Sequence, residues 1–109
     1  MSTIKSDVEK LVQKELEAAN QKFPVFRSDH EGAAMIFEEI EECKQEIENL
    51  EIQFEVLWSH VKDDNKMSVI TSERLKLTAA NLACEAIQVA AMAQKFMDIK
   101  KEREKSEGN

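Results

Sequence analysis

Apolar residues recur at helical spacing near the start of the chain, at Val8, Leu11, Val12, Leu16 and Ala19. Ser6 and Glu9 have the spacing of a helix capping box. The pattern predicts an amphipathic helix over about residues 3–21. We expect Pro24 to end it, because proline lacks a backbone donor and disfavours the helical conformation of the residue before it.

A second and longer helix is predicted to begin at Ser28, which forms another capping-box pair with Glu31. Apolar residues then alternate in steps of four and three, at Ile36, Ile40, Cys43, Ile47, Leu50, Phe54, Leu57 and Val61. A continuous helix over this heptad seam and its flanks is about 45–50 Å long. A compact chain of this length has a radius of gyration of only about 13 Å. Either the helix bends or breaks, or its far end packs on another subunit, and we favour the second.

A third helix is predicted from about Val69 to Arg103, after the polar loop at residues 63–66. Its apolar residues repeat at a spacing of seven and are interleaved with seven alanines: Leu75, Leu82, Val89 and Phe96, with Ala79, Ala80, Ala83, Ala86, Ala90, Ala91 and Ala93. Small residues allow close helix packing, so we expect this helix to be the most enclosed one. Residues 100–109 carry no large apolar side chain and are expected to fray.

Together these patterns predict one all-α domain over residues 1–109, a long-helix bundle whose four-helix packing is completed by oligomerisation. We expect a homo-oligomer, either a dimer or a tetramer. With two glycines, one proline and no tyrosine, the chain is unlike a turn-rich β-sandwich or barrel.

The negative net charge argues against two classes of partner, nucleic acids and anionic membrane surfaces. Fifteen Lys and Arg against twenty-two Asp and Glu give a net charge of −7. Without a basic patch, such a chain is expected to bind neither nucleic acid nor a membrane surface.

No apolar run is long enough to span a bilayer. Cys43 and Cys84 form no CxxC pair, so we expect a cytoplasmic protein with reduced thiols.

Acidic residues border the apolar seam of the second helix. At about 100° per residue, Glu39, Glu46 and Glu42 lie about 60°, 80° and 120° from Ile36. Like charges at this spacing disfavour a helix by a few tenths of a kcal/mol per pair. A hard divalent cation such as Mg²⁺ or Mn²⁺ would relieve the repulsion, because these ions prefer carboxylate oxygen.

The third helix supplies a counterpart, since Glu85 is the only acidic residue between Glu73 and Asp98. A lone carboxylate is costly to bury without a partner. Antiparallel packing of the two helices would bring Glu39 and Glu42 to Glu85 and make a three-carboxylate metal site. Two simpler interpretations stay open: the glutamates form a solvated face, or Glu85 pairs with a Lys or Arg of a neighbouring helix.

Two short motifs at these positions resemble a known family. Residues 38–42 read Glu-Glu-Ile-Glu-Glu and fit an EExxE motif, while residues 85–88 match an ExxD motif except for Gln88 in place of Asp. In this pairing the chain resembles the MazG-type all-α nucleotide pyrophosphohydrolase superfamily, especially its small phage and bacterial members. The resemblance covers about residues 26–96.

This resemblance implies a Mg²⁺-dependent hydrolase that cleaves a nucleoside triphosphate to the monophosphate and pyrophosphate. It assigns Glu39 and Glu42 as metal ligands, Glu38 as a group that either orients water or supports a metal ligand, and Glu85 as the first ligand of the second motif. Gln88 could still ligate the metal through its amide oxygen, but it brings no charge. We therefore expect weaker metal binding and reduced activity.

Three further residues are candidates for contacting the substrate: His30, Asn81 and Lys95. His30 could touch a phosphate or a base, and Lys95 could meet a phosphate, although both residue types are most often solvated on such helices. The alternative to an enzyme is a non-catalytic module, one that either assembles through the Leu50–Val61 seam or holds a nucleotide without cleaving it.

Overall fold

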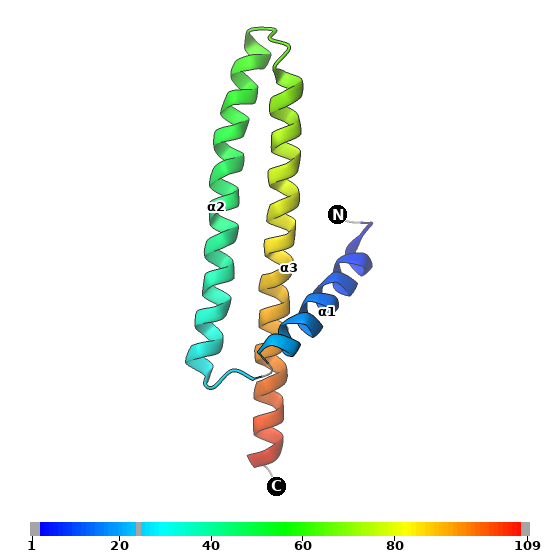
Figure 1. The fold of residues 1–109 in the computed structure, drawn as a ribbon, viewed down its shortest axis with the longest axis vertical. Coiled ribbons are helices and arrows are strands. Elements are labelled where there is room, and N and C mark those ends of the chain that lie inside the picture. The colour runs from blue at the N-terminus through cyan, green and yellow to red at the C-terminus, as the bar shows by residue number, and fades with distance from the viewer. Residues whose placement is uncertain (1–2, 24, 108–109) are drawn as a thin grey trace.

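The computed structural model describes residues 3–23 and 25–107, which form three helices: α1 (Lys5–Lys22), α2 (Asp29–Lys62) and α3 (Ser68–Glu107). No strand occurs in this part of the chain, so the predicted all-α class is confirmed. The two long helices α2 and α3 run antiparallel as a hairpin, and the shorter α1 crosses α3 obliquely (Figure 1).

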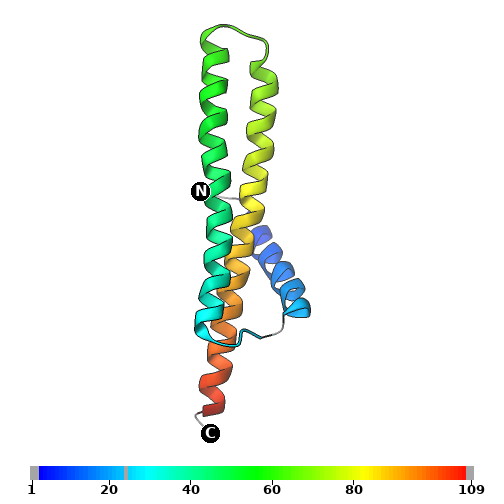
Figure 2. The ribbon, with the colours of Figure 1, turned by 60° about the vertical axis from the view of Figure 1, so that its left-hand side comes forward.

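The second helix is unbroken over its 34 residues. As a result the molecule measures 69 × 28 × 24 Å and its radius of gyration is 18.7 Å, well above that of a compact chain of this size. The bend or break considered for this helix does not occur, and the far end of the hairpin extends well beyond α1 (Figure 2). Among the described residues, no helix is both long and apolar enough to cross a bilayer.

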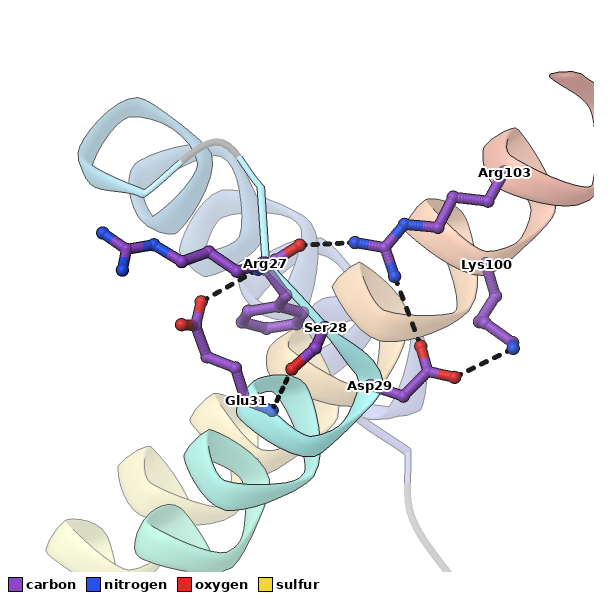
Figure 3. Close-up of polar contacts among 7 residues, drawn as sticks. Arg27, Ser28, Asp29, Glu31, Lys100 and Arg103 are labelled. Atoms are coloured by element: carbon purple, nitrogen blue, oxygen red, sulfur yellow. Dashed lines mark hydrogen bonds and ion pairs between the residues drawn. The ribbon is translucent and has the colours of Figure 1, made fainter.

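One of the two predicted helix caps is confirmed. Ser28 precedes α2, and its hydroxyl accepts a hydrogen bond of 3.1 Å from the backbone N–H of Glu31 (Figure 3). The Glu31 carboxylate in turn accepts from the backbone N–H of Arg27. The capping box predicted at Ser6 is wrong, because α1 already begins at Lys5 and its N-cap residue Ile4 makes no side-chain cap hydrogen bond.

The loop predicted near residues 63–66 joins α2 to α3. Asp64 adopts a left-handed conformation with φ of 52°, which aspartate tolerates better than most residues. The Asn65 side chain then accepts a hydrogen bond of 2.9 Å from the backbone N–H of Met67. These contacts reverse the chain within a few residues and set the two long helices side by side.

The core lies at the end of the hairpin that α1 covers. Its buried apolar residues come from α1, the following linker and α3: Leu16, Phe26, Ala91 and Met92. Both other helices pack against α3, and Ala91 has no exposed surface. The predicted central position of this helix is therefore confirmed, but of its seven alanines only Ala91 is buried and the other six are exposed.

A polar clamp holds the start of α2 against the C-terminal part of α3. Asp29 accepts hydrogen bonds from Lys100 at 2.9 Å and Arg103 at 3.4 Å, and Arg103 also donates to the carbonyl of Phe26 at 2.6 Å (Figure 3). The hydrogen bond from Lys100 lowers the pKa of Asp29. The predicted fraying from Lys100 onward is therefore wrong, since the clamp holds Lys100 and Arg103 in place and α3 continues to Glu107. Residues 108–109 lie outside the described part.

The heptad seam of α2 is only partly used within the chain. Four of its residues are half-buried against α3: Ile36, Cys43, Leu50 and Leu57. The other four are exposed: Ile40, Ile47, Phe54 and Val61. The neighbouring polar positions take their place and are half-buried: Glu39, Glu46, Gln53 and His60. The hairpin interface is thus rotated from the predicted seam towards the acidic side of the helix.

Gly32 is buried where α2 meets the core. A Cβ atom at this position would lie 2.6 Å from the Phe96 ring and 2.9 Å from the Phe26 ring. We expect Gly32→Ala to lower the free energy of unfolding by about 1–3 kcal/mol, because the rings must move. At an ordinary helical position the same substitution gains about 1 kcal/mol. The test is therefore whether Gly32→Ala lowers or raises the free energy of unfolding measured in urea. A rise would contradict this packing.

Candidate metal centre

Three glutamates from the two long helices meet in the middle of the hairpin. Glu39 and Glu42 lie one turn apart on α2, and Glu85 faces them from α3. One carboxylate oxygen of each residue lies within 4.8 Å of the others. These three residues, called the acidic cluster below, are the ones that the sequence analysis expected to meet. Antiparallel packing of α2 and α3 creates the convergence, since the residues are 43 positions apart in sequence at the closest, from Glu42 to Glu85.

Part of the acidic cluster is shielded from solvent. One carboxylate oxygen of Glu39 and one of Glu85 are buried and have no hydrogen-bond partner within the described structure. Glu42 is exposed, so the cluster opens to solvent on its side. In the described part of the chain no Lys or Arg forms an ion pair with Glu85, which removes the simplest alternative explanation for this residue.

Hydrogen bonding and burial, together with nearby like charge, raise the pKa of two of these carboxyl groups. Hydrogen bonding to the Glu42 carboxyl, followed by burial, raises the pKa of Glu85 to about 7. The pKa of Glu39 is also raised, first by burial and then by the charge of Glu42. Burial and nearby like charge both disfavour the ionised form. The chain therefore holds these groups together at an electrostatic cost.

The donor set of the acidic cluster fits a hard divalent cation. Magnesium and manganese prefer carboxylate oxygens, and magnesium is commonly bound through a small number of carboxylates. A cation would also give the two unpartnered oxygens a ligand and reduce the repulsion among the three glutamates. Glu46, whose charge also acts on Glu85, adds to the negative potential of the site.

An open groove of about 260 Å³ begins at Glu39 and runs between the three helices. Gln88 lines this groove together with Glu39. From α1 and the residue after it, Glu15, Lys22 and Phe23 also line it. The sequence analysis missed these three residues, because nothing in the apolar periodicity of α1 indicates where it crosses the hairpin. Lys22 places a positive charge in the groove that is also lined by Glu39, a candidate metal ligand.

The glutamates of α2 near the apolar seam lie in two different environments. Glu38, predicted as a water-orienting residue, is exposed and lies outside the acidic cluster. Glu41 is also exposed and forms an ion pair of 3.5 Å with Lys44 on the same helix. Glu38 and Glu41 therefore belong to a solvated face of the helix, as one of the simpler interpretations expected, whereas Glu39 does not.

None of the three candidate substrate contacts lines the groove at Glu39. His30 is exposed in the first turn of α2, nine residues before Glu39, which is about 13 Å along the helix. Asn81 is exposed on α3, one turn from Glu85. Neither residue lines the groove at Glu39.

Lys95 has a different role from the predicted one, since only 2% of its surface is exposed. Its ammonium group donates to the carbonyl oxygen of Phe23 and lies 4.9 Å from the centre of the Phe26 ring. Burial lowers the pKa of this ammonium group. Lys95 thus ties the linker after α1 to the core, and its charge is already engaged there.

Comparison with protein-family models, with curated proteins and with solved structures finds no match to this chain. The interpretation of the site therefore depends on its own geometry and chemistry.

Proposed function

We propose that this protein is a Mg²⁺-dependent nucleoside triphosphate pyrophosphohydrolase of the MazG-like type, acting on free nucleotides in the cytoplasm. Manganese is the expected substitute metal. The observation that carries the proposal is the convergence of Glu39, Glu42 and Glu85, contributed by the EExxE segment and by the partial ExxD segment. Two of these carboxylates each hold a buried oxygen without a hydrogen-bond partner among the described residues, as expected of metal ligands.

In this proposal, the three glutamates hold the cation, and Gln88 is a further oxygen ligand from the groove wall. The bound metal would neutralise phosphate charge and favour the attack of water. Water then adds across the anhydride between the α- and β-phosphoryl groups, giving a nucleoside monophosphate and pyrophosphate. Lys22 is suited to contact the phosphates by its charge, and Phe23 offers an aromatic face in the same groove.

The amide at Gln88 limits the strength of such a site. A carboxylate there would add a fourth negative charge, whereas the amide oxygen contributes only a dipole. We therefore propose a site with modest metal affinity and reduced turnover. Gln88→Glu or Gln88→Asp would raise metal affinity if this account of the site is correct.

The experiment is a pyrophosphate-release assay with the purified full chain and a panel of ribo- and deoxyribonucleoside triphosphates. We expect at least one nucleotide to release equimolar monophosphate and pyrophosphate in millimolar Mg²⁺, and none to do so in EDTA. Glu39→Gln is expected to reduce the rate by about 100-fold or more, because it removes a charged ligand.

Glu48→Gln is the matched control, since Glu48 is an exposed glutamate of the same helix outside the acidic cluster. Its rate should stay within about two-fold of wild type, as expected of a surface residue remote from the chemistry. Metal-dependent nucleotide binding without pyrophosphate release would favour the non-catalytic alternative. Equal rates for Glu39→Gln and wild type would refute the proposed site.

A further inference from the structure

Lys95 of α3 is the one charged residue that is buried in the described part of the chain. None of the ion pairs among the described residues involves it, so no carboxylate pairs with its charge. Removing an ammonium group from water without such a partner is costly. Methionine, an apolar residue of similar length, would fill this part of the core without that cost. The charge at Lys95 is therefore not explained by packing alone.

The ammonium group of Lys95 holds the end of α1. It donates to the carbonyl oxygen of Phe23, the C-cap residue of α1. The backbone N–H of Phe23 donates to the carbonyl of Ala19 within α1, at 2.8 Å. Both backbone polar groups of Phe23 are thus occupied, one by α1 and the other by α3. Because hydrogen bonds from charged donors are stronger than neutral ones, Lys95 ties the last turn of α1 to a defined point on α3.

The end of α1 has little packing of its own. Within the described structure α1 packs on α3 and not on α2, and its buried residue, Leu16, lies more than a turn before the end. Lys22 and Phe23 are exposed, the second with 61% of its surface, so neither side chain is anchored in the core. Their placement therefore depends on how the backbone at Phe23 is held.

The same end of α1 forms part of the groove at Glu39. Lys22 and Phe23 line this groove from α1 and the residue after it. Met92 lines it from α3, about one turn before Lys95. The Lys95 side chain thus connects the part of the groove that α3 forms to the part that α1 forms. A shift of α1 at this point would move the Lys22 ammonium group relative to the candidate metal ligands.

We infer that Lys95 is a positioning residue for nucleotide binding, which holds Lys22 and Phe23 at the groove through the carbonyl of Phe23. This role rests on the proposed function, in which Lys22 contacts the phosphates. Lys95 does not touch the nucleotide, because its ammonium group is engaged by Phe23 and by the Phe26 ring at 4.9 Å. A fixed end of α1 lowers the entropy cost of binding, since the nucleotide need not order it. Lys95 therefore controls affinity for the nucleotide rather than the chemical step.

Lys95→Met tests this role, because it removes the charge and the hydrogen bond while filling similar space. Its melting temperature should fall by no more than about 5 °C, since an apolar side chain replaces a buried charge. In the pyrophosphate-release assay KM should rise by about 10-fold while kcat stays within about three-fold, because the phosphate contact is lost equally from bound substrate and transition state. Lys101→Met is the matched control, an exposed lysine of the same helix that does not line the groove. Its KM should stay within about two-fold of wild type.

A double-mutant cycle separates positioning from a purely structural role. Lys22→Met should raise KM by about 10-fold in the wild-type background, because it removes the charge that contacts the phosphates. In the Lys95→Met background it should raise KM by less than about two-fold, since Lys22 is already displaced there. A 10-fold effect in both backgrounds would overturn the inference. So would a larger fall in the melting temperature of Lys95→Met than the one given above, because it would assign Lys95 to stability.

Amide hydrogen exchange distinguishes failure of this inference from failure of the proposed function. The Phe23 amide should exchange about 10-fold faster or more in Lys95→Met than in wild type, while the Gln88 amide of α3 keeps its rate. Unchanged exchange at Phe23 would overturn the inference whatever the activity. A wild-type chain that releases no pyrophosphate would refute the proposed function alone, and the exchange rates would then decide whether Lys95 positions the end of α1.

Discussion

Phe26→Ala is expected to lower the free energy of unfolding by about 3–4 kcal/mol, the cost of removing a large aromatic side chain from a packed core. Only 3% of the Phe26 surface is exposed. Its ring packs over Gly32 and lies 4.9 Å from the Lys95 ammonium group. The substitution therefore opens a cavity and removes a favourable contact from a buried cation. Urea unfolding followed by circular dichroism, at one protein concentration, measures the change.

Phe37→Ala provides the comparison for Phe26→Ala. Phe37 is an aromatic residue of α2 with 59% of its surface exposed, so little packing is lost. We expect this variant to lose less than about 1 kcal/mol. Similar losses for the two phenylalanines would mean that the linker after α1 does not pack on the hairpin as described.

Glu85→Gln is expected to stabilise the metal-free protein at alkaline pH by on the order of 2 kcal/mol. The pKa of Glu85 is about 7 in the folded chain, against an ordinary value of 4.5. Between these values the folded state binds more protons than the unfolded state, so stability falls as pH rises through this window. Glutamine carries no charge and removes this part of the pH dependence. Urea unfolding of wild type and Glu85→Gln in EDTA, at pH 5 and pH 8, measures this pH dependence.

Divalent metal should reverse the effect of this substitution. Millimolar Mg²⁺ or Mn²⁺ is expected to raise the melting temperature of wild type more at pH 8 than at pH 5, because ligands must be deprotonated to bind. Glu85→Gln should lose most of this gain, while Glu48→Gln keeps it. A wild-type melting temperature insensitive to both metals at pH 8 would remove the metal site from the proposal.

Local signals in the sequence predict the elements of this fold well. Ser28 with Glu31 marks the start of α2, and the apolar-free residues after Lys62 mark the loop, since both signals act over a few residues. The end of α3 was missed because its stability comes from Asp29, more than 70 positions earlier, which binds Lys100 and Arg103. A contact between distant positions leaves no trace in local periodicity.

For the candidate site, helical spacing was sufficient to group Glu39 with Glu42. Glu85 could be added because it is isolated in an apolar helix and the intervening loop is short enough to make the two helices antiparallel. The contribution of α1 could not be predicted in this way. Lys22 and Phe23 reach the groove through the oblique crossing of α1 over α3, and Lys95 turns into the core through its bond to Phe23.

By itself the sequence determined the helical class, the start of α2, the loop between the two long helices and the acidic residues that border their contact, because periodicity and turn chemistry are local properties. Only the tertiary structure decided how α2 is rotated against α3. That rotation leaves Glu39 and Gln53 half-buried in place of Ile40 and Phe54, so it creates the acidic cluster and exposes an apolar row. The rotation depends on the packing of whole helices around a core at one end of the hairpin, which a repeat along one chain segment does not specify.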